Sequence, residues 1–335
     1  MSARLLVRIL REPAGASWLS TDEWNALIAA ARSERLIGAL AHRLRKVRIP
    51  APVAPILTDA LLDTAREKQQ ALWEADRMQA ALAPLGVPVL LLKGTAYLAA
   101  ELQAGEGRFI GDLDILVPRA ALPAVEVALF KAGWEWVKPD PYDDHYYRQW
   151  MHELPPMIHR ERDRMIDVHH TILPLTARPT PDVDAMIRDS VALDSGVRIL
   201  APIDMVCHSA AHMLADGDLT GGLRNLWDIH CLLQEFHRDP AFRAKLKARA
   251  KWHGLGPHVA RAARLADHFY GSHAKTLGVF DRIVAARLLA RDGWGRETSV
   301  DLRAAFFVRS HWMRMPPLML ARHLYTKWRM GHRPA

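Results

Sequence analysis

The sequence predicts an α+β fold in which a small mixed sheet is flanked by helical regions on both sides along the chain. Two observations lead to this prediction. Apolar residues recur at helical spacing before residue 84 and again after residue 201. Between these regions lie short apolar runs bounded by glycine and proline, which are typical of strands. We therefore expect an N-terminal helical region (1–83), a core with the sheet (84–200) and a C-terminal helical domain (201–335).

The composition is that of a globular protein with a basic surface. Half of the 335 residues are hydrophobic, 24% are charged, and the net charge is +8. This charge favours encounters with nucleotides, nucleic acid or acidic membranes without selecting one of them. The only two cysteines, Cys207 and Cys231, exclude a disulfide framework or a cysteine-rich metal site. No apolar run approaches the ~20 residues that cross a bilayer, and no signal peptide is evident, so we expect a cytoplasmic protein.

The region before residue 84 is predicted to be helical. Ser20 and Glu23 fit a capping box, in which the serine caps a helix and the glutamate reaches back to it. Prolines then interrupt the chain before a long helical pattern over 56–82. Its apolar stripe consists of Leu61, Ala65, Leu72, Ala75, Met78 and Leu82. This region contains no group of catalytic side chains, so we interpret it as a layer that supports or covers the core.

The core opens with an apolar strand over 89–92 and a turn, Lys93-Gly94-Thr95, into a helix. Glycine lets the backbone approach a phosphate closely, and the helix N-terminus offers free N–H groups and positive potential. Lys93 adds a point charge suited to a triphosphate. A glycine turn between strand and helix is common in α/β proteins, so its meaning depends on the strand that comes after it.

A second strand in the core carries Asp112 and Asp114 within an apolar run. Aspartate is depleted in strands, so a pair of aspartates requires a reason. Because strand side chains alternate between faces, the two carboxylates share one face. Their Cα atoms are roughly 6.5–7 Å apart, so the carboxylates can converge on one or two divalent cations. Such a site suits phosphoryl or nucleotidyl transfer, in which paired metals hold the attacking and leaving oxygens.

The order of these motifs resembles the polymerase-β-like nucleotidyltransferases. The sequence LLKG is followed by a helix, by Arg108, by the acidic strand 112–117 and by a second helix that ends at 132–134. More narrowly, the pattern is similar to the bacterial branch known only as uncharacterised nucleotidyltransferases. The resemblance is strong over 89–134 and weaker over 166–169 and 202–236. Distant relatives have Gly-Ser where this chain has Gly-Thr, and a shorter loop before the acidic strand.

The resemblance implies a nucleotidyltransferase core that binds Mg²⁺, with Mn²⁺ as the alternative ion, and an NTP as substrate. A nucleoside monophosphate would pass to an acceptor, with release of pyrophosphate. Asp112 and Asp114 would hold the metal, and Lys93, Gly94 and Thr95 would bind the triphosphate. Arg108 lies on a glycine-rich loop just before the acidic strand. It either contacts phosphate or forms a salt bridge to one of the two aspartates when no metal is bound.

A later strand supplies further candidates. Met165, Asp167 and His169 share one of its faces. Asp167 is a candidate third carboxylate that completes the metal site and acts as general base for the acceptor. The alternative is an ordinary aspartate on an edge strand. His169 either orients the acceptor or a metal-bound water, or is a packed histidine without a functional role.

The rest of the core is predicted from local signals. We expect a helix between Pro118 and Lys131, with Pro123 in its first turn, and a strand over 134–137. The prolines and aspartates of 138–147 predict a loop, with Asp143 and Asp144 in solvent. Two or three antiparallel strands are expected between residues 146 and 172, with a turn over 160–164.

The C-terminal domain offers two weaker signals. His208 and His212 stand four residues apart on a predicted helix and either line a pocket or form part of a zinc site, for which no third local ligand is evident. Arg224 and Asp228 form a possible contact on the next helix. The spacing of Arg224 and His230 also resembles that of the helical ribonucleases that partner minimal nucleotidyltransferases.

The tail after Asp301 contains no acidic residue and mixes arginines with aromatic and apolar residues. Pro316-Pro317 is expected to divide it into two helices. We favour helices that pack on the domain over an amphipathic segment that contacts anionic lipid or an acidic partner.

These signals predict a Mg²⁺-dependent nucleotidyltransferase whose acceptor is a small molecule, a sugar, a peptide or a protein. Template-directed polymerisation is not expected, because no duplex-binding module is evident. Two alternatives stay open: a catalytically silent nucleotide-binding or regulatory protein, and a toxin–antitoxin component with a helical ribonuclease-like domain. The sequence leaves the acceptor, the preferred NTP and the oligomeric state undetermined.

Overall fold

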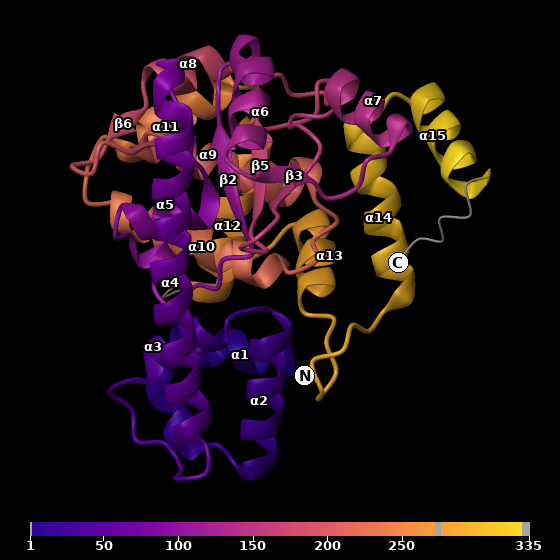
Figure 1. Ribbon diagram of the computed structural model, residues 1–335. Coiled ribbons are helices and arrows are strands. Elements are labelled where there is room, and N and C mark those ends of the chain that lie inside the picture. Colours follow the sequence, from indigo (N-terminus) through magenta and orange to yellow (C-terminus); the bar gives the residue numbers. More distant parts are fainter. Residues whose placement is uncertain (1, 272–275, 330–335) are drawn as a thin grey trace.

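The computed structural model describes residues 2–271 and 276–329 (Figure 1). A single mixed sheet of seven strands has the order β3-β4-β5-β2-β1-β7-β6. Its central strand β2 runs parallel to β5 and antiparallel to β1. Helices flank the sheet, so the predicted α+β class is confirmed. The strands are β1 (Leu90–Leu91), β2 (Asp112–Leu116), β3 (Trp134–Trp136), β4 (Met157–His159), β5 (Met165–His169), β6 (Val191–Ala192) and β7 (Arg198–Ile199).

Four helices form the N-terminal region: α1 (Ser2–Arg11), α2 (Thr21–Ser33), α3 (Ile37–Leu44) and α4 (Ala54–Leu82). The predicted capping box opens α2. The Ser20 hydroxyl accepts from the Glu23 N–H at 3.3 Å, and the Glu23 carboxylate accepts from the Ser20 N–H at 2.9 Å. These two bonds satisfy backbone donors that a helix N-terminus leaves free.

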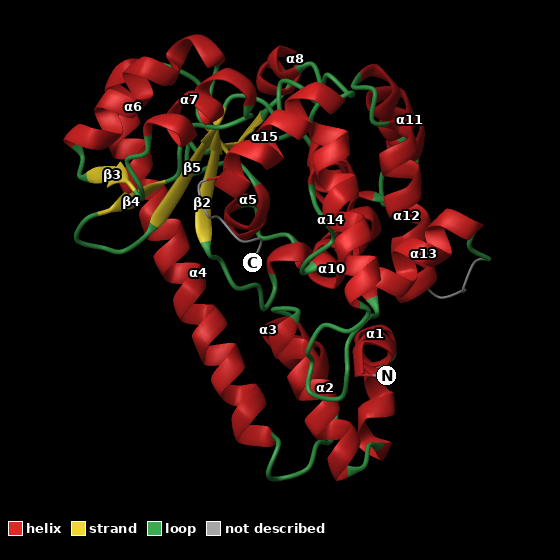
Figure 2. Ribbon diagram, turned by 90° about the vertical axis from the view of Figure 1, so that its right-hand side faces the viewer, coloured by secondary structure: helices red, strands yellow, loops and turns green. Residues whose placement is uncertain are grey.

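The long helix α4 runs from the N-terminal helices to the sheet (Figure 2). Its buried stripe includes Ala75, Met78 and Leu82 as predicted, whereas Ala65 is exposed and Thr64 is buried instead. Buried Glu74 forms an ion pair of 2.7 Å with Arg162, in the turn between β4 and β5. The helix is therefore attached to the strand pair that includes β5, which supports its predicted role as a supporting element.

Three helices of the core connect the strands: α5 (Lys93–Ala99), α6 (Leu122–Lys131) and α7 (Pro141–Trp150). The predicted loop over 138–147 is wrong, because α7 occupies most of it. The Asp140 side chain accepts from the N–H groups of Tyr142 and Asp143, and Pro141 is the first helical residue. An aspartate cap followed by proline is a helix start signal that outweighs the turn-forming composition. As a result, only β4 and β5 form between residues 146 and 172.

A further connecting helix, α8 (Val183–Arg188), lies between β5 and β6. After β7 the described chain is helical, with α9 (Pro202–Ala211), α10 (Gly222–Phe236), α11 (Phe242–Trp252), α12 (Gly256–Tyr270), α13 (Val279–Leu288), α14 (Val300–Arg314) and α15 (Pro317–Arg329). Helix α9 continues as a π-helical segment, His212–Asp216. Helices α9 and α10 bury most of their residues and form the centre of this region.

The N-terminal helices contact the C-terminal helical region directly. Helix α1 packs against α12. Buried Glu34, at the end of α2, pairs with Arg291 at 2.7 Å. Among the residues that the structure describes, no helix is long and apolar enough to cross a membrane.

The basic tail forms two helices, and the predicted break lies at Pro316. Helix α14 packs on the domain through buried Phe306, and Arg309 donates to the Leu214 carbonyl in the π-helical segment at 2.7 Å. Residues 330–335 of the tail lie outside the described residues. Contact of the tail with lipid or an acidic partner, the less favoured alternative, is not tested by these contacts.

Candidate active site

Three carboxylates meet on adjacent strands at the centre of the sheet. The register of β2 and β5 places Asp114 beside Asp167 and Asp112 beside Met165. Because side chains two residues apart on a strand share a face, Asp112 projects to the same side as Asp114. One carboxylate oxygen from each aspartate lies within 4.8 Å of the other two. The structure thus brings the three predicted carboxylates together.

This donor set fits a hard divalent cation. Its ligands are all carboxylate oxygens, which Mg²⁺ and Mn²⁺ prefer over nitrogen or sulfur. Asp114 is 3% exposed, Asp167 is partly buried, and Asp112 at the start of β2 is exposed. An ion or a nucleotide can therefore approach the group from the side of Asp112.

Asp114 has two basic partners. Lys93 Nζ lies 2.6 Å from Asp114 Oδ1, and His169 Nε2 lies 3.0 Å from the same oxygen. Burial by itself would raise the pKa of Asp114, but the charge of Lys93 and the hydrogen bond from His169 outweigh it and lower the pKa. Asp114 is therefore a carboxylate at neutral pH. In the same way, despite burial, the carboxylate raises the pKa of Lys93.

The other two carboxylates have pKa values shifted in the opposite direction. Burial, together with the charges of Asp114 and Asp112, raises the pKa of Asp167 to about 7. The charge of Asp114, followed by burial, raises the pKa of Asp112. Near neutral pH, the negative charge of the three aspartates is thus offset by Lys93 and in part by a proton on Asp167. A divalent cation would replace that proton and relieve the remaining repulsion.

The geometry of this group agrees with a comparison of the sequence with known families. A family model described as an uncharacterised nucleotidyltransferase matches residues 20–271. The chain belongs to this nucleotidyltransferase family. A search of curated proteins found no match to the chain. The match includes the sheet, the three aspartates and helices α9–α12, so these helices belong to the family's common structure.

The predicted phosphate-binding turn lies beside the carboxylates. Lys93 begins α5 with a φ of +46°, a left-handed conformation that is uncommon outside glycine. Its ammonium group points to Asp114. A Cβ atom at Gly94 would lie 2.5 Å from Arg108 Nε and 2.6 Å from Ile110 Cδ1. Glycine is therefore required for close packing of the following loop, and buried Thr95 has no hydrogen-bond partner for its hydroxyl among the described residues.

Arg108 does not form the predicted salt bridge to Asp112 or Asp114. Its Nη1 atom pairs with Asp228 Oδ2 of α10 at 2.8 Å, and its guanidinium lies 5.5 Å from the centre of the Tyr97 ring. Both partners of this ion pair are buried. The pair also replaces the predicted contact of Asp228 with Arg224, which donates to Asn225 instead. Arg108 therefore connects the glycine turn to the helical domain, and its Nε atom lacks a partner in the described chain.

The histidine pair at the end of α9 lies near the carboxylates. Burial, with the nearby charges of Lys93 and His169, lowers the pKa of His208 to about 3. Burial and Lys93 also lower the pKa of His212 far below its ordinary value. Both are neutral rings at pH 7. Within the described chain, neither belongs to a group of three metal-ligating side chains, so a zinc site at this pair is not supported.

Sequence reasoning missed His152 and Glu153, which lie in the segment between α7 and β4. Glu153 forms a β-bridge with His169, and its carboxylate lies 3.3 Å from His169 Nδ1. Helix α7 also brings Tyr147 into this neighbourhood, where burial and the charges of Glu153 and Asp167 raise the pKa of its phenol. No spacing in the sequence links these residues to β5, because only the tertiary fold brings them together.

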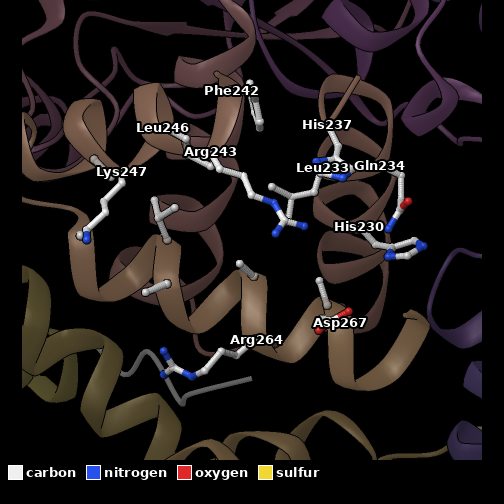
Figure 3. A pocket seen from close by; sticks show the side chains of 16 residues that line it. His230, Leu233, Gln234, His237, Phe242, Arg243, Leu246, Lys247, Arg264 and Asp267 are labelled. Atoms are coloured by element: carbon white, nitrogen blue, oxygen red, sulfur yellow. The ribbon is translucent and has the colours of Figure 1, made fainter. Parts of the chain in front are cut away.

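His230 lies in a different part of the molecule. It lines a cavity of about 380 Å³ bounded by α10, α11 and α12 (Figure 3). Arg224 lines another cavity, beside Lys93 and Arg108. Six residues on a helix turn through about 600°, so these two side chains leave α10 on different faces. Arg224 and His230 thus line separate cavities, and the ribonuclease-like alternative stays an untested prediction.

Proposed function

We propose that the chain transfers a nucleoside monophosphate from an NTP to an acceptor, with Asp112, Asp114 and Asp167 holding Mg²⁺. The observation that carries this proposal is the convergence of the three carboxylates across the parallel pair of β2 and β5. When bound, the metal supplies positive charge that neutralises the triphosphate and the leaving pyrophosphate. The family match supports a nucleotidyltransferase, and the ion and the acceptor belong to the proposal.

In this proposal Lys93 has two successive partners. In the structure its ammonium compensates Asp114 at 2.6 Å. When the Asp114 carboxylate takes part in metal binding, the ammonium becomes available to a phosphate oxygen of the nucleotide. The Lys93 ammonium already lies beside the carboxylates, so this exchange would require only a side-chain movement. Gly94, Thr95 and Arg108 stay predicted phosphate-binding residues that act through this turn.

Asp167 is the group proposed to accept the proton of the acceptor hydroxyl. Without a metal its pKa is raised to about 7, and a bound cation would displace this proton and leave the carboxylate able to accept the proton of the acceptor. The acceptor oxygen forms a bond to the α-phosphorus as its proton passes to Asp167, and the bond between the α-phosphorus and the bridging oxygen breaks. Pyrophosphate leaves with the electron pair of that bond. His169, hydrogen-bonded to Asp114, keeps the neighbouring carboxylate in position.

The test is an incubation with NTPs labelled at the α-phosphate, with Mg²⁺ or Mn²⁺ and candidate acceptors. We expect pyrophosphate release and transfer of label, and loss of both in Asp112→Asn. The matched control is Asp59→Asn, which removes an exposed aspartate on α4. Binding of NTP and metal without any transfer would favour a catalytically silent nucleotide-binding protein. The absence of NTP binding in the presence of metal would refute both functions.

A further inference from the structure

A second group of metal-ligating side chains lies next to the three aspartates. It consists of His152, Glu153 and His169, and one ligand atom from each lies within 4.8 Å of the other two. Glu153 Oε2 is 3.3 Å from His169 Nδ1 and 3.7 Å from His152 Nε2. The two imidazole rings are stacked with centroids 5.2 Å apart. The group therefore has two nitrogen donors and one oxygen donor around a common point.

The hydrogen bond of His169 determines which of its nitrogens is free. Nε2 lies 3.0 Å from Asp114 Oδ1, and an ionised carboxylate only accepts hydrogen bonds. Nε2 therefore carries the proton, and Nδ1 of the neutral ring presents a lone pair toward Glu153. Nδ1 is buried and makes no hydrogen bond among the described residues. Two acceptors thus face each other at 3.3 Å, and a metal cation between them would relieve their repulsion.

Among the described residues, His152 also lacks a hydrogen-bond partner for a buried ring nitrogen. Its side chain is 9% exposed, and its buried Nδ1 atom has no hydrogen-bond partner in the described chain. Its Nε2 atom, at 3.7 Å from Glu153 Oε2, is too distant for a hydrogen bond. Buried imidazoles normally bond through at least one nitrogen, so a ring of this kind beside a carboxylate indicates a missing partner.

We propose that His152, Glu153 and His169 form a transition-metal site that binds Zn²⁺, separate from the site of the three aspartates. Two imidazoles and one carboxylate are a known zinc ligand set, whereas Mg²⁺ prefers oxygen ligands alone. Bonds of about 2.0–2.2 Å in a tetrahedral site place ligand atoms about 3.3 Å from one another. The two separations in the structure, 3.3 and 3.7 Å, are close to this value.

In this site Asp114 is the outer carboxylate of a zinc-bound histidine. Metal-ligating histidines commonly donate their second N–H to a carboxylate, which fixes the ring and its tautomer. The bond from His169 Nε2 to Asp114 Oδ1 has this form. Zinc would therefore hold His169, and through it the most buried carboxylate of the neighbouring site. The ion can enter at Glu153, whose side chain is 17% exposed.

The site is tested by metal binding, without any nucleotide. The protein is stripped with a chelator and titrated with Zn²⁺ in the Asp112→Asn/Asp167→Asn background, which disables the oxygen site and keeps Asp114. We expect one equivalent of Zn²⁺ to remain after gel filtration. Co²⁺ in its place should give the visible absorption of a four-coordinate ion. The result does not depend on nucleotidyl transfer, so a negative outcome here leaves the proposed function intact.

Ligand variants locate the ion. His152→Ala and Glu153→Gln should each weaken Zn²⁺ binding by more than the roughly 10–100-fold that loss of an outer partner costs. The matched control is His170→Asn, which removes a neighbouring buried imidazole whose Nε2 atom bonds the Met151 carbonyl. This control should bind Zn²⁺ as tightly as the parent, which is the Asp112→Asn/Asp167→Asn protein without further substitution. Circular dichroism establishes that each variant is folded.

Four outcomes would overturn the proposal, the last of which concerns the protonation of His169. One is that the folded parent retains no Zn²⁺. Another is that His208→Gln abolishes binding while His152→Ala leaves it unchanged. The third is that X-ray absorption at the zinc edge shows no imidazole scattering, a measurement on the parent that needs no ligand variant to fold. If His169 is protonated on both nitrogens in the presence of Zn²⁺, a proton rather than a metal lies between it and Glu153.

Discussion

Two buried aspartates in this molecule have the same kinds of partner and different surroundings. Asp114 in the sheet pairs with Lys93 and His169. Asp204 on α9 pairs with Arg249, through two hydrogen bonds of 2.8 and 2.7 Å, and with His253 at 3.1 Å. Both carboxylates have a lowered pKa, because these partners outweigh the effect of burial.

The Asp204 group is saturated. Arg249 contacts both carboxylate oxygens, and His253 Nδ1 accepts from the backbone N–H of Asp182 at 3.1 Å while Nε2 faces Asp204. The Asp114 group is open, because His169 Nδ1 lacks a hydrogen bond and two further carboxylates stand beside it. The difference separates a saturated ion pair from one that leaves room for the proposed metal. Unused lone pairs and uncompensated charge mark the place where a ligand belongs.

The largest expected effect is on transfer by the open group. Asp112→Asn should lower turnover about 1000-fold, or about 4 kcal/mol of transition-state stabilisation, because one carboxylate of the metal site is lost. The free energy of unfolding should stay equal or rise, since repulsion from Asp114 is relieved. Label transfer and urea denaturation measure the two quantities. Full turnover in this variant would place the site elsewhere.

The saturated group should show the opposite behaviour. Asp204→Asn removes both hydrogen bonds of the buried Arg249 guanidinium to Asp204 and leaves it only the exposed carboxylate of Asp189, 2.9 Å from Nη1. The free energy of unfolding should fall by about 3–5 kcal/mol. Activity per folded molecule should not change, because Arg249 and His253 are not partners of the three aspartates. Urea denaturation with activity at low denaturant measures both. If Asp204→Asn were as stable as the unsubstituted protein but turned over more slowly, Asp204 would not be the purely structural group that this comparison requires.

Asp114→Asn should destabilise the fold less than Asp204→Asn does, by about 1–3 kcal/mol. Lys93 loses its closest partner, yet Asp112 and Asp167 remain nearby to compensate its charge, and one repulsive carboxylate is gone. Only this loss of stability distinguishes the variant from Asp112→Asn, since both should lose transfer. Denaturation of the two variants side by side provides the measurement. Equal stability of the two would mean that Lys93 does not depend on Asp114.

Per unit of pH, the smallest effect is the change of stability with pH. The pKa of Asp167 is raised from 3.8 to about 7 in the folded protein, so the folded state binds its proton more tightly than the unfolded chain. Stability should therefore fall as pH rises from about 4 to about 7, with a slope of up to ~1.4 kcal/mol per unit. Asp167→Asn should abolish this slope. Asp204, whose pKa is lowered, contributes stability that is lost only as the pH falls below its ordinary range.

Local sequence rules predicted several features correctly. The two-residue period of a strand places Asp112 and Asp114 on one face, and a capping box starts α2 at Ser20. Helix α7 was open to prediction as well, since Asp140-Pro141 is a start signal that the composition of its surroundings concealed. In each of these cases the determining interaction lies within a few residues along the chain.

Other features depend on contacts between distant residues. The sequence identified Asp167 as a candidate site residue, but only the parallel register of β2 and β5 places it beside Asp114. Arg108 forms its ion pair with Asp228, 120 residues away along the chain, and not with Asp112 or Asp114, which follow it closely.

By itself, the sequence determined the α+β class, the acidic strand and the face that its aspartates share, because these follow from local periodicity and capping. Only the tertiary structure decided which strand lies next to the acidic one, which charge compensates which, and that His152 and Glu153 reach His169. The physical reason is that electrostatic and hydrogen-bonding partners are selected by distance in space, which the spacing along the chain does not fix.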